Sequence, residues 1–467
     1  MVDTDCAGGD GLVCEATKGY CVAAADSPIR IGQSAPASGP SQDLGLEIRR
    51  GVQLAFDAQN LMGGIRGRPL VLDFLDDQYN PDLAERNARL LTDVQVGTAP
   101  PRCPTTKTAP VAGQANFSET ELLPGPNAVL AVIGSVGTPT MVRSAPVIVE
   151  TQRVYFGAYT GATTMLRNNV AGDCKKLIFN VRASYAQEAR ATLEYFTSLG
   201  VPDDTHLISF DQSDTFGDAG YNGLVAAYTA FKNATPTIKR FRYTRDDVNS
   251  VSAQVTATTG ALHDLLTAKA GNQSVGILMT DTYGPASTYT KGVKDWLYGQ
   301  NADQTALGQA TRLSVYFSNI SFVGPNSLAS RLKELGTLAN GKSYSENVFV
   351  SQVVPNYQTD NSDAVLTYRK LIGTTSAPAT YTSFEGYVTA RIFIEGLKKT
   401  AGGMNPANLA TAFESLASLD IGLGGFVGYT PDNHQASKSV WGTAINADGT
   451  FTDKYFWSDG ASIQLAE

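Results

Sequence analysis

The segment at residues 134–140 (GSVGTPT) has the composition of an anion-binding loop. It follows the apolar run at 128–134, which predicts a buried strand, and Pro139 is typical of the first turn of a helix. The first backbone N–H groups of a helix lack intrahelical partners and lie at the positive end of the helix dipole, so they bind anions. Thr138 adds a hydroxyl donor, or it simply caps the helix, and the two roles are compatible. The segment therefore predicts an anion pocket.

Residues for acid–base or nucleophilic catalysis do not form a recognisable pattern. The three histidines, His206, His263 and His434, belong to no H-E-x-x-H motif, and there is no G-x-S-x-G motif. Paired carboxylates stay open as a catalytic alternative, because the chain has 44 acidic residues. We therefore predict neither an enzyme nor a cofactor.

The stretch at 336–343 (GTLANGKS) has the spacing of a phosphate-binding P-loop. A P-loop follows a strand and begins a helix. Here the helical pattern SLASRLKEL precedes the stretch and the strand pattern NVFVSQVV follows it. We interpret it as a helix end and a turn, with positive φ at Gly336 or Gly341, rather than a nucleotide site.

Strands and helices alternate along most of the chain, which predicts parallel sheets covered by helices on both faces. The length of 467 residues exceeds the roughly 250–300 residues of a single core, so we expect two domains. Residues 97–127 interrupt the alternation and predict a long surface insertion, and 426–465 predicts antiparallel structure with a hairpin through 446–449. The predicted strands are 29–32, 70–75, 128–134, 154–157, 206–210, 274–280, 314–317 and 347–353, and the predicted helices are 47–60, one from 81, one from about 139, 186–199, 287–298, 328–335 and 381–399.

Composition and charge narrow the class of partner. Hydrophobic residues make up 42% and charged residues 17%, which fits an ordered globular protein. The net charge of −8 argues against nucleic acid and anionic membrane surfaces as partners. No run of 18 apolar residues is present, so we expect no membrane-spanning helix. The N-terminus lacks a signal peptide, so either the protein is cytosolic or the signal has been removed.

The cysteines favour an oxidising compartment and a removed signal. Cys6, Cys14 and Cys21 lie close together among Gly, Asp and Thr, which predicts a small disulfide knot. A zinc site is the weaker alternative, because no C-x-x-C pair and no nearby histidine is present. Cys103 and Cys174 are candidates to bridge each other. The odd total suggests that one partner was lost with the N-terminus, either a lipid-anchor cysteine or one more knot cysteine.

Several segments, taken in order, resemble the periplasmic leucine/isoleucine/valine-binding family of solute receptors. They are IGQSAPASGPSQDLG, NLMGGIRGRPLVLDFLDD, AVIGSVGTPT and FDQSDTFGDAG. The later segments SFVGPNSLASRLKELG, FVSQVVPNY, YTSFEGYVTARIFIEGLKK and TPDNHQASKSVWGTAI are similar to an ABC-importer branch of that family. The resemblance covers about residues 28–460 and leaves out the Cys-rich leader.

This resemblance implies an α/β, type I periplasmic-binding-protein fold. Such a fold has two Rossmann-like lobes, three hinge crossovers and a ligand cleft between the lobes. Ligands of open α/β sheets bind at the carboxyl ends of the strands. The implied division is a leader at 1–27, lobe 1 at 28–182 plus 355–436, and lobe 2 at 183–354 plus 437–467.

In lobe 1 the resemblance implies that Thr138 binds the ligand's carboxylate. The backbone of Ala158 and the N–H and hydroxyl of Thr160 would contact the α-carboxylate and the amine. Tyr159 departs from the family, where a small residue is usual. It would narrow the cleft or stack on the ligand, or it is an exposed loop aromatic. Leu44 would line the same cleft or, more simply, pack under the start of a helix.

In lobe 2, Phe216 stands where the family places an aromatic residue, and Tyr283 is the second aromatic candidate; ordinary loop packing is the alternative for both. Relatives that bind amino acids place an acid near 317–321, which here reads FSNIS. Asp281 or Glu385 would replace it, unless they are a helix cap and a surface charge. The expected ligand is therefore an amino acid or a related carboxylate or amide.

The resemblance implies a monomeric, periplasmic or otherwise extracytoplasmic solute-binding protein that serves an ABC permease. A sensory ligand-binding module of the same fold is the main alternative, and an enzyme is a third. No metal, cofactor or nucleic acid is expected.

Overall fold

The computed structural model describes residues 12–15, 20–23, 27–103, 120–163, 172–269, 271–303 and 313–466. The chain divides into two compact units. Unit 1 is Met1–Arg182 with Asp360–Ser437, and unit 2 is Ala183–Thr359 with Lys438–Glu467. The chain therefore passes between the units three times. Within the described ranges, no helix combines the length and the apolar character that crossing a membrane requires.

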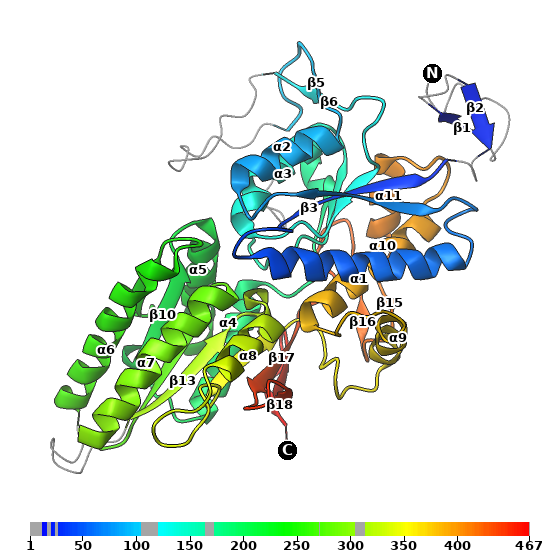
Figure 1. Cartoon of the computed structure of the whole chain (residues 1–467). Helices are drawn as coiled ribbons and strands as arrows, with labels where there is room; N and C mark the ends of the chain where they lie inside the picture. The colour runs from blue at the N-terminus through cyan, green and yellow to red at the C-terminus, as the bar shows by residue number, and fades with distance from the viewer. Residues whose placement is uncertain are drawn as a thin grey trace. The chain divides into compact units, whose positions relative to one another are not determined.

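Unit 1 contains a five-stranded, wholly parallel sheet in the order β4-β3-β7-β8-β9. In chain order this is the 2-1-3-4-5 arrangement of a doubly wound sheet. Helices α1 and α10 pack together on one face, and α2 and α3 cover the other (Figure 1). The elements are β3 (Ile29–Ala35), α1 (Gln42–Leu61), β4 (Leu70–Asp76), α2 (Pro81–Leu91), β7 (Ala131–Ile133), α3 (Thr138–Glu150), β8 (Val154–Phe156), β9 (Ile178–Phe179), α9 (Asp363–Ile372), α10 (Tyr381–Lys399) and α11 (Pro406–Glu414).

Aromatic side chains fill the core of unit 1 beneath α10 and α11. The Phe156 ring lies 4.5 Å from the Phe413 ring and 5.2 Å from the Phe393 ring, measured between centroids. Phe179 stacks on His434 at 4.1 Å. These contacts join the last strands of the parallel sheet to the helices that return from residue 360 onward, so they hold the two chain segments of the unit together.

Unit 2 contains an eight-stranded sheet in the order β11-β10-β12-β13-β14-β17-β18-β19. Its first five strands are parallel and again follow the 2-1-3-4-5 arrangement, and the last three are antiparallel. Helices α6, α7 and α8 lie side by side, and α4 and α5 pack together (Figure 1). The elements are α4 (Tyr185–Ser198), β10 (Leu207–Gln212), α5 (Thr215–Lys232), β11 (Lys239–Tyr243), α6 (Val251–Ala268), β12 (Gln273–Thr280), α7 (Tyr283–Asp303), β13 (Leu313–Asn319), α8 (Pro325–Glu334), β14 (Val348–Gln352), β17 (Ser439–Ile445), β18 (Phe451–Ser458) and β19 (Gln464–Leu465).

The prediction of an α/β fold with parallel sheets is confirmed, as is the hairpin through 446–449, which joins β17 to β18. The P-loop-like stretch begins two residues after α8 ends, and φ is +77° at Gly336 and +81° at Gly341. It is therefore a turn, as predicted. Four helices of the structure, α5, α6, α9 and α11, were not predicted from the sequence.

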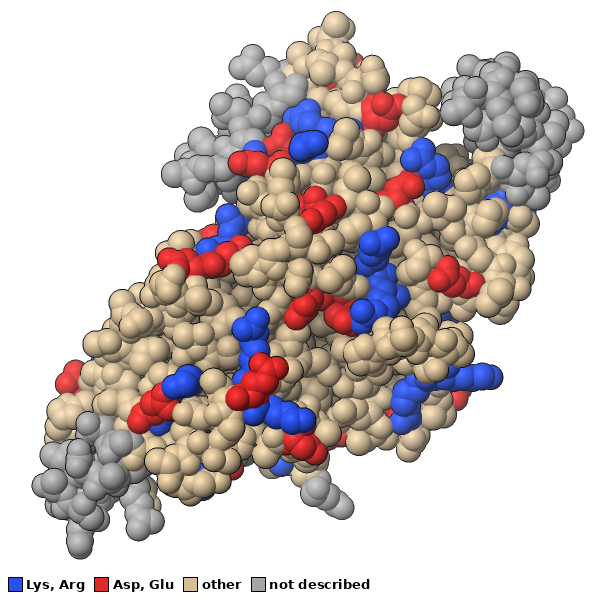
Figure 2. Space-filling model, in the orientation of Figure 1, with Lys and Arg blue, Asp and Glu red and all other residues tan. Residues whose placement is uncertain are grey.

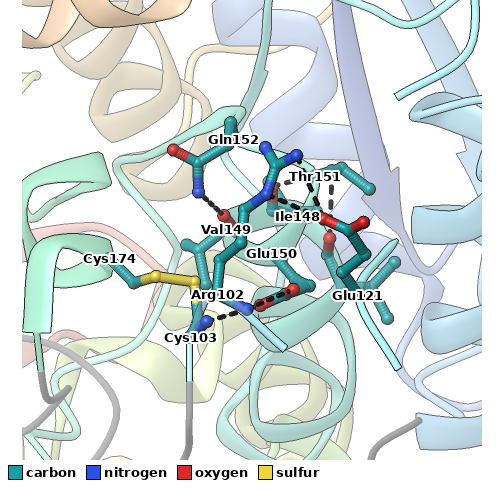
Figure 3. Close-up of a disulfide and its surroundings, with 10 residues drawn as sticks. Arg102, Cys103, Glu121, Ile148, Val149, Glu150, Thr151, Gln152 and Cys174 are labelled. Carbon is teal, nitrogen blue, oxygen red and sulfur yellow. Dashed lines mark hydrogen bonds and ion pairs between the residues drawn. A yellow bond between two sulfur atoms is a disulfide. The ribbon is translucent and has the colours of Figure 1, made fainter. Parts of the chain in front are cut away.

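The long insertion after residue 96 is tied to the rest of unit 1 by a disulfide. The bridge between Cys103 and Cys174, expected from the sequence, is present (Figure 3). The Glu150 carboxylate, at the end of α3, accepts hydrogen bonds from the backbone N–H groups of Arg102 and Cys103, both at 2.7 Å (Figure 3). A short ribbon of β5 (Gln95–Val96) and β6 (Leu122–Leu123) pairs the two ends of the insertion.

The Cys-rich leader contains one ribbon, in which β1 (Leu12–Glu15) pairs with β2 (Tyr20–Ala23) and Cys14 lies opposite Cys21. The side chains of the predicted disulfide knot lie outside the described residues. A further two-stranded ribbon, β15 (Leu419–Asp420) with β16 (Phe426–Val427), belongs to unit 1.

Candidate functional site

The topology of unit 1 selects one edge of its sheet for ligand binding. The chain passes from β3 to α1 on one face and from β7 to α3 on the other, so the strand order reverses between these neighbours. At such a switch point the loops diverge and leave a crevice at the carboxyl ends of the strands. The predicted anion segment follows β7 directly, and Thr138 is the first residue of α3.

Two threonine hydroxyls meet at this edge. The Oγ1 atoms of Thr138 and Thr160 are 2.7 Å apart, and both side chains are fully buried. Two backbone hydrogen bonds join the loops that carry them: the N–H of Gly137 donates to the carbonyl of Tyr159, and the N–H of Tyr159 donates to the carbonyl of Ser135. The structure thus brings the two residues together, as their positions after adjacent strands predict.

Glycine is required at position 137, where the loop packs against Tyr79. Its φ of +100° favours glycine, and a Cβ atom there would lie 2.3 Å from Cε2 of Tyr79. Gly137 is also the N-cap of α3, and no side chain caps the helix. The alternative that Thr138 caps the helix is therefore wrong: its hydroxyl instead bonds to Thr160, and the first helical N–H groups keep no intrahelical partner.

A buried ion pair, which sequence reasoning did not predict as such, lies beside the threonines. The Arg182 guanidinium is 3.5 Å from the Glu385 carboxylate, with side chains 1% and 7% exposed. It also lies over the Tyr159 ring at 4.8 Å, and the Tyr159 hydroxyl is 3.4 Å from Thr382 Oγ1. The alternatives of an exposed loop aromatic for Tyr159 and a surface charge for Glu385 are therefore wrong.

The other two unit 1 candidates have mainly backbone or packing roles in this structure. The carbonyl of Ala158 accepts the N–H of Thr160 at 2.8 Å. Leu44 is the third residue of α1 rather than part of the preceding loop, and its side chain is 1% exposed. The simpler interpretation, packing under the start of the helix, describes Leu44.

The switch point of unit 2 lies between β10 and β12, and the three remaining candidates follow these strands. Phe216 is the second residue of α5 and packs between Tyr185 and Phe322, with ring centroids at 5.7 and 4.5 Å. Tyr283 is the first residue of α7 and carries the Arg331 guanidinium over its ring at 5.0 Å. Both are buried helix residues rather than loop residues.

Asp281 follows β12 and is fully buried. Neither carboxyl oxygen makes a well-formed hydrogen bond within the described part of the chain. Burial raises the pKa of Asp281 well above its usual value, the nearby Asn319 side chain opposes this, and the charge of Asp211 adds to it. The neutral carboxylic acid is thereby favoured, and this form can donate a hydrogen bond to a ligand, whereas a ligand ammonium group would favour ionisation of Asp281.

The described residues offer no cluster of three or more His, Cys, Asp or Glu side chains that would hold a metal ion. His206 and His434 have structural partners: His206 lies between Asp203 and Gln273, and His434 between the carbonyl of Ile178 and Glu414. On the face shown in Figure 2, basic and acidic side chains are interspersed over the described surface.

Comparison with known proteins supports the family and the fold that the sequence predicts. The chain matches the family described as "Periplasmic binding protein" over residues 28–116 and 125–450. The crystal structure of a possible leucine/isoleucine/valine-binding protein from Rhodopirellula baltica SH 1 is similar over 92% of this chain and 97% of that chain, with a TM-score of 0.70 and 26% identity. A fatty acid ABC transporter substrate-binding protein from Thermomonospora curvata is similar over 95% and 93%, with a TM-score of 0.66 and 15% identity, which is a likeness of fold.

A curated relative, the Leu/Ile/Val-binding protein homolog 3 of Brucella melitensis biotype 1, is 39% identical over 66 residues. That match spans 14% of this chain and 18% of the relative's length. The family match covers most of the chain, and both units have the sheet order that the fold requires. The chain therefore belongs to the periplasmic binding protein family, a family of extracytoplasmic substrate-binding proteins, and has its type I α/β fold.

Proposed function

We propose that this chain is an extracytoplasmic solute receptor that closes its two units over a small carboxylate-bearing solute and delivers it to an ABC permease. One observation carries the proposal: the hydroxyls of Thr138 and Thr160 meet at 2.7 Å where α3 begins, at the switch point of unit 1. One hydroxyl of the bonded pair keeps its proton for a ligand, and together with the N–H groups of Thr138 and Thr140 at the helix start it suits a carboxylate.

The protonation state of Asp281 in unit 2 narrows the class of solute that we propose. Asp281 is the acid in unit 2 that would face a ligand amine. Because burial favours its neutral form, binding an ammonium group there requires Asp281 to ionise and release a proton. A carboxylate or an amide without an amine carries no such cost. We therefore place organic acids and amides ahead of amino acids, while branched-chain amino acids stay in the panel because two relatives are named for them.

The direct test is a thermal-shift and calorimetric panel of aliphatic amino acids, the matching hydroxy and keto acids, and their amides. A bound solute raises the melting temperature of the native state. In Thr138→Val we expect the affinity to fall by about 10- to 100-fold, because a hydrogen bond to a charged group contributes roughly 1.5–3 kcal/mol. Thr151→Val is the matched control: Thr151 is equally buried, at the other end of α3, and its hydroxyl bonds to the Val147 carbonyl. Equal affinities in the two variants, or a panel without a hit, would overturn the proposal.

Asp281→Asn separates the ligand classes. The variant keeps a hydrogen-bond donor but cannot ionise, so it should bind amine-free carboxylates as the parent does and lose affinity for amino acids. Uptake of the labelled solute by cells with and without the gene then separates transport from sensing, since a purely sensory receptor would leave uptake unchanged.

A further inference from the structure

A cavity lies within unit 2, lined by residues of α7, β13 and the turn before β14. Its volume is about 190 Å³. Leu313 and Ser314, which line it, begin β13, so the cavity is at the amino ends of the strands. Phe216 and Asp281 follow the carboxyl ends, at the opposite edge of the same sheet. The cavity is smaller than the roughly 300–1,000 Å³ of drug-sized pockets, so it suits a small molecule.

Lys294 is the unusual residue of this cavity. It is 2% exposed, and the one hydrogen bond that its Nζ makes within the described residues goes to the backbone carbonyl of Glu346. An ammonium group has three donors, so two remain for a ligand. The Phe317 ring lies 5.4 Å from Nζ. Burial lowers the pKa of Lys294 to about 7, partly offset by Glu346 and reinforced by Lys342, so near neutral pH the amine is poised between its two forms.

The other charges of the cavity balance each other. Lys342 Nζ is 2.7 Å from the Glu346 carboxylate, and these two side chains are about half exposed at the rim. Besides Lys294, the one titratable group that the described side chains of α7 add to the cavity is the Tyr298 phenol, and the residues of β13 that line the cavity are uncharged. With a neutral Lys294 the site has no net charge, and a protonated Lys294 leaves one positive charge to be compensated. Since uncompensated buried charge is costly, the electroneutral way to fill the site is one monoanion together with one proton.

We propose that this cavity is a second ligand site that binds a small monoanion, a short-chain carboxylate. Its carboxylate accepts hydrogen bonds from Lys294 Nζ. Lys342, the lysine of the P-loop-like stretch, contributes positive charge at the rim. A polyphosphate does not fit, because the volume is small and one amine beside one paired lysine cannot neutralise it.

The test is isothermal titration calorimetry of the whole chain with acetate and with propionate, in Tris and in HEPES. Proton uptake makes the measured heat depend on the buffer's ionisation enthalpy. Because the free amine titrates near pH 7, we expect the uptake to rise from near zero at pH 6 toward about one proton per ligand at pH 8. Lys294→Met should abolish binding, whereas Thr138→Val should leave it unchanged. The second comparison separates this site from the proposed solute site.

Lys342→Gln keeps the test informative if Lys294→Met does not fold. Lys342 is about half exposed, so the fold should tolerate the change, and we expect the affinity to fall by about two- to fivefold, the range for a partly exposed ion pair. Lys291→Gln, on the exposed face of α7, is the matched control and should have no effect. The proposal is overturned if neither anion binds at millimolar concentration, if the heat is independent of buffer at pH 8, or if Thr138→Val removes the binding.

Discussion

Two adjacent carboxyl groups at the end of β4 have opposite protonation preferences. Asp77 is fully buried, and burial raises its pKa to about 7, although the Ser34 hydroxyl and the Tyr79 N–H both donate to it. Burial also acts to raise the pKa of Asp76, but hydrogen bonds led by the N–H of Ala37 outweigh it and the pKa is lowered. The two residues therefore contribute to stability in opposite ways as pH changes.

The pH dependence follows from these signs. The native state holds the Asp77 proton up to about pH 7, whereas the unfolded chain releases it near 3.8, so stability falls as pH rises through that window and levels off above it. Asp77→Asn should remove this fall in stability. At 1.36 kcal/mol per pH unit, it should raise the free energy of unfolding at pH 8 by up to about 4 kcal/mol. Urea unfolding of the parent and the variant at pH 5, 6, 7 and 8 measures how the free energy of unfolding depends on pH. Asp76→Asn, the control, should destabilise at pH 7 and lose its effect as pH falls below the lowered pKa. An unchanged slope in Asp77→Asn would contradict the prediction.

At the residue scale, sequence reasoning succeeded where the signal was local. Thr138 and Asp281 each lie after a strand and at or just before the first turn of the next helix, so their places at the carboxyl edges were predictable. Arg182, Glu385 and Tyr159 come from three distant segments, and nothing local in the sequence indicates that they meet. The threonine contact itself required both the loop order and the positive φ of Gly137.

Helices α1 and α10 pack so closely that glycine is required at their contact. A Cβ atom on Gly51 would lie 1.9 Å from the carbonyl oxygen of Ser383. We expect Gly51→Ala to destabilise unit 1 by about 2 kcal/mol, the usual cost of overpacking, despite alanine's higher helix propensity. Gly260→Ala in α6 is the matched control: a Cβ there meets nothing within 4 Å, so the variant should gain about 0.5–1 kcal/mol. Chemical unfolding measures the free energy of unfolding of both variants. A Gly51→Ala variant more stable than the parent would refute the close packing of α1 and α10.

The disulfide of Figure 3 is expected to stabilise unit 1 by constraining its unfolded state. Its cysteines are 71 residues apart, and the typical contribution of a disulfide is about 2–4 kcal/mol, toward the upper end for a long loop. Cys103→Ser with Cys174→Ser should therefore lower the melting temperature by several degrees, measured by calorimetry without reductant so that the leader cysteines are undisturbed. An unchanged melting temperature would show that Glu150 alone anchors the insertion.

Elements were predicted best where their ends carry signals. The limits of α10 match the predicted helix at 381 and 399, and both ends carry signals: a Thr380 capping box begins the helix, and Lys398 and Lys399 are its last two residues. In contrast, α5 carries three glycines, which weaken its helical pattern. Two of these glycines allow close packing of α5 against its neighbours. A Cβ on Gly217 would lie 1.9 Å from the Gln212 carbonyl oxygen, and one on Gly220 would lie 2.1 Å from Thr280 Oγ1. Tertiary packing, absent from any local pattern, decides such helices.

At the scale of the whole molecule, chain length and the strand–helix alternation were sufficient to predict an α/β protein with more than one core. Each unit has its own sheet in the same strand order, and each is assembled from segments that are far apart in the chain. Because the chain passes between the units three times, neither unit is continuous in sequence, yet each has its own hydrophobic core.

All three tryptophans, Trp296, Trp441 and Trp457, belong to unit 2, so intrinsic tryptophan fluorescence reports on that unit while circular dichroism reports on both. If the cores unfold separately, the Cys103→Ser/Cys174→Ser variant should shift part of the dichroism transition and leave the fluorescence transition in place. Lys294→Met, in unit 2, should shift the fluorescence transition together with the unit 2 part of the dichroism transition. A solute that binds both units should bring the two transitions together, because it stabilises only the state in which both are folded. Coincident shifts of both signals without solute would instead show that the three crossings couple the cores into one cooperative unit.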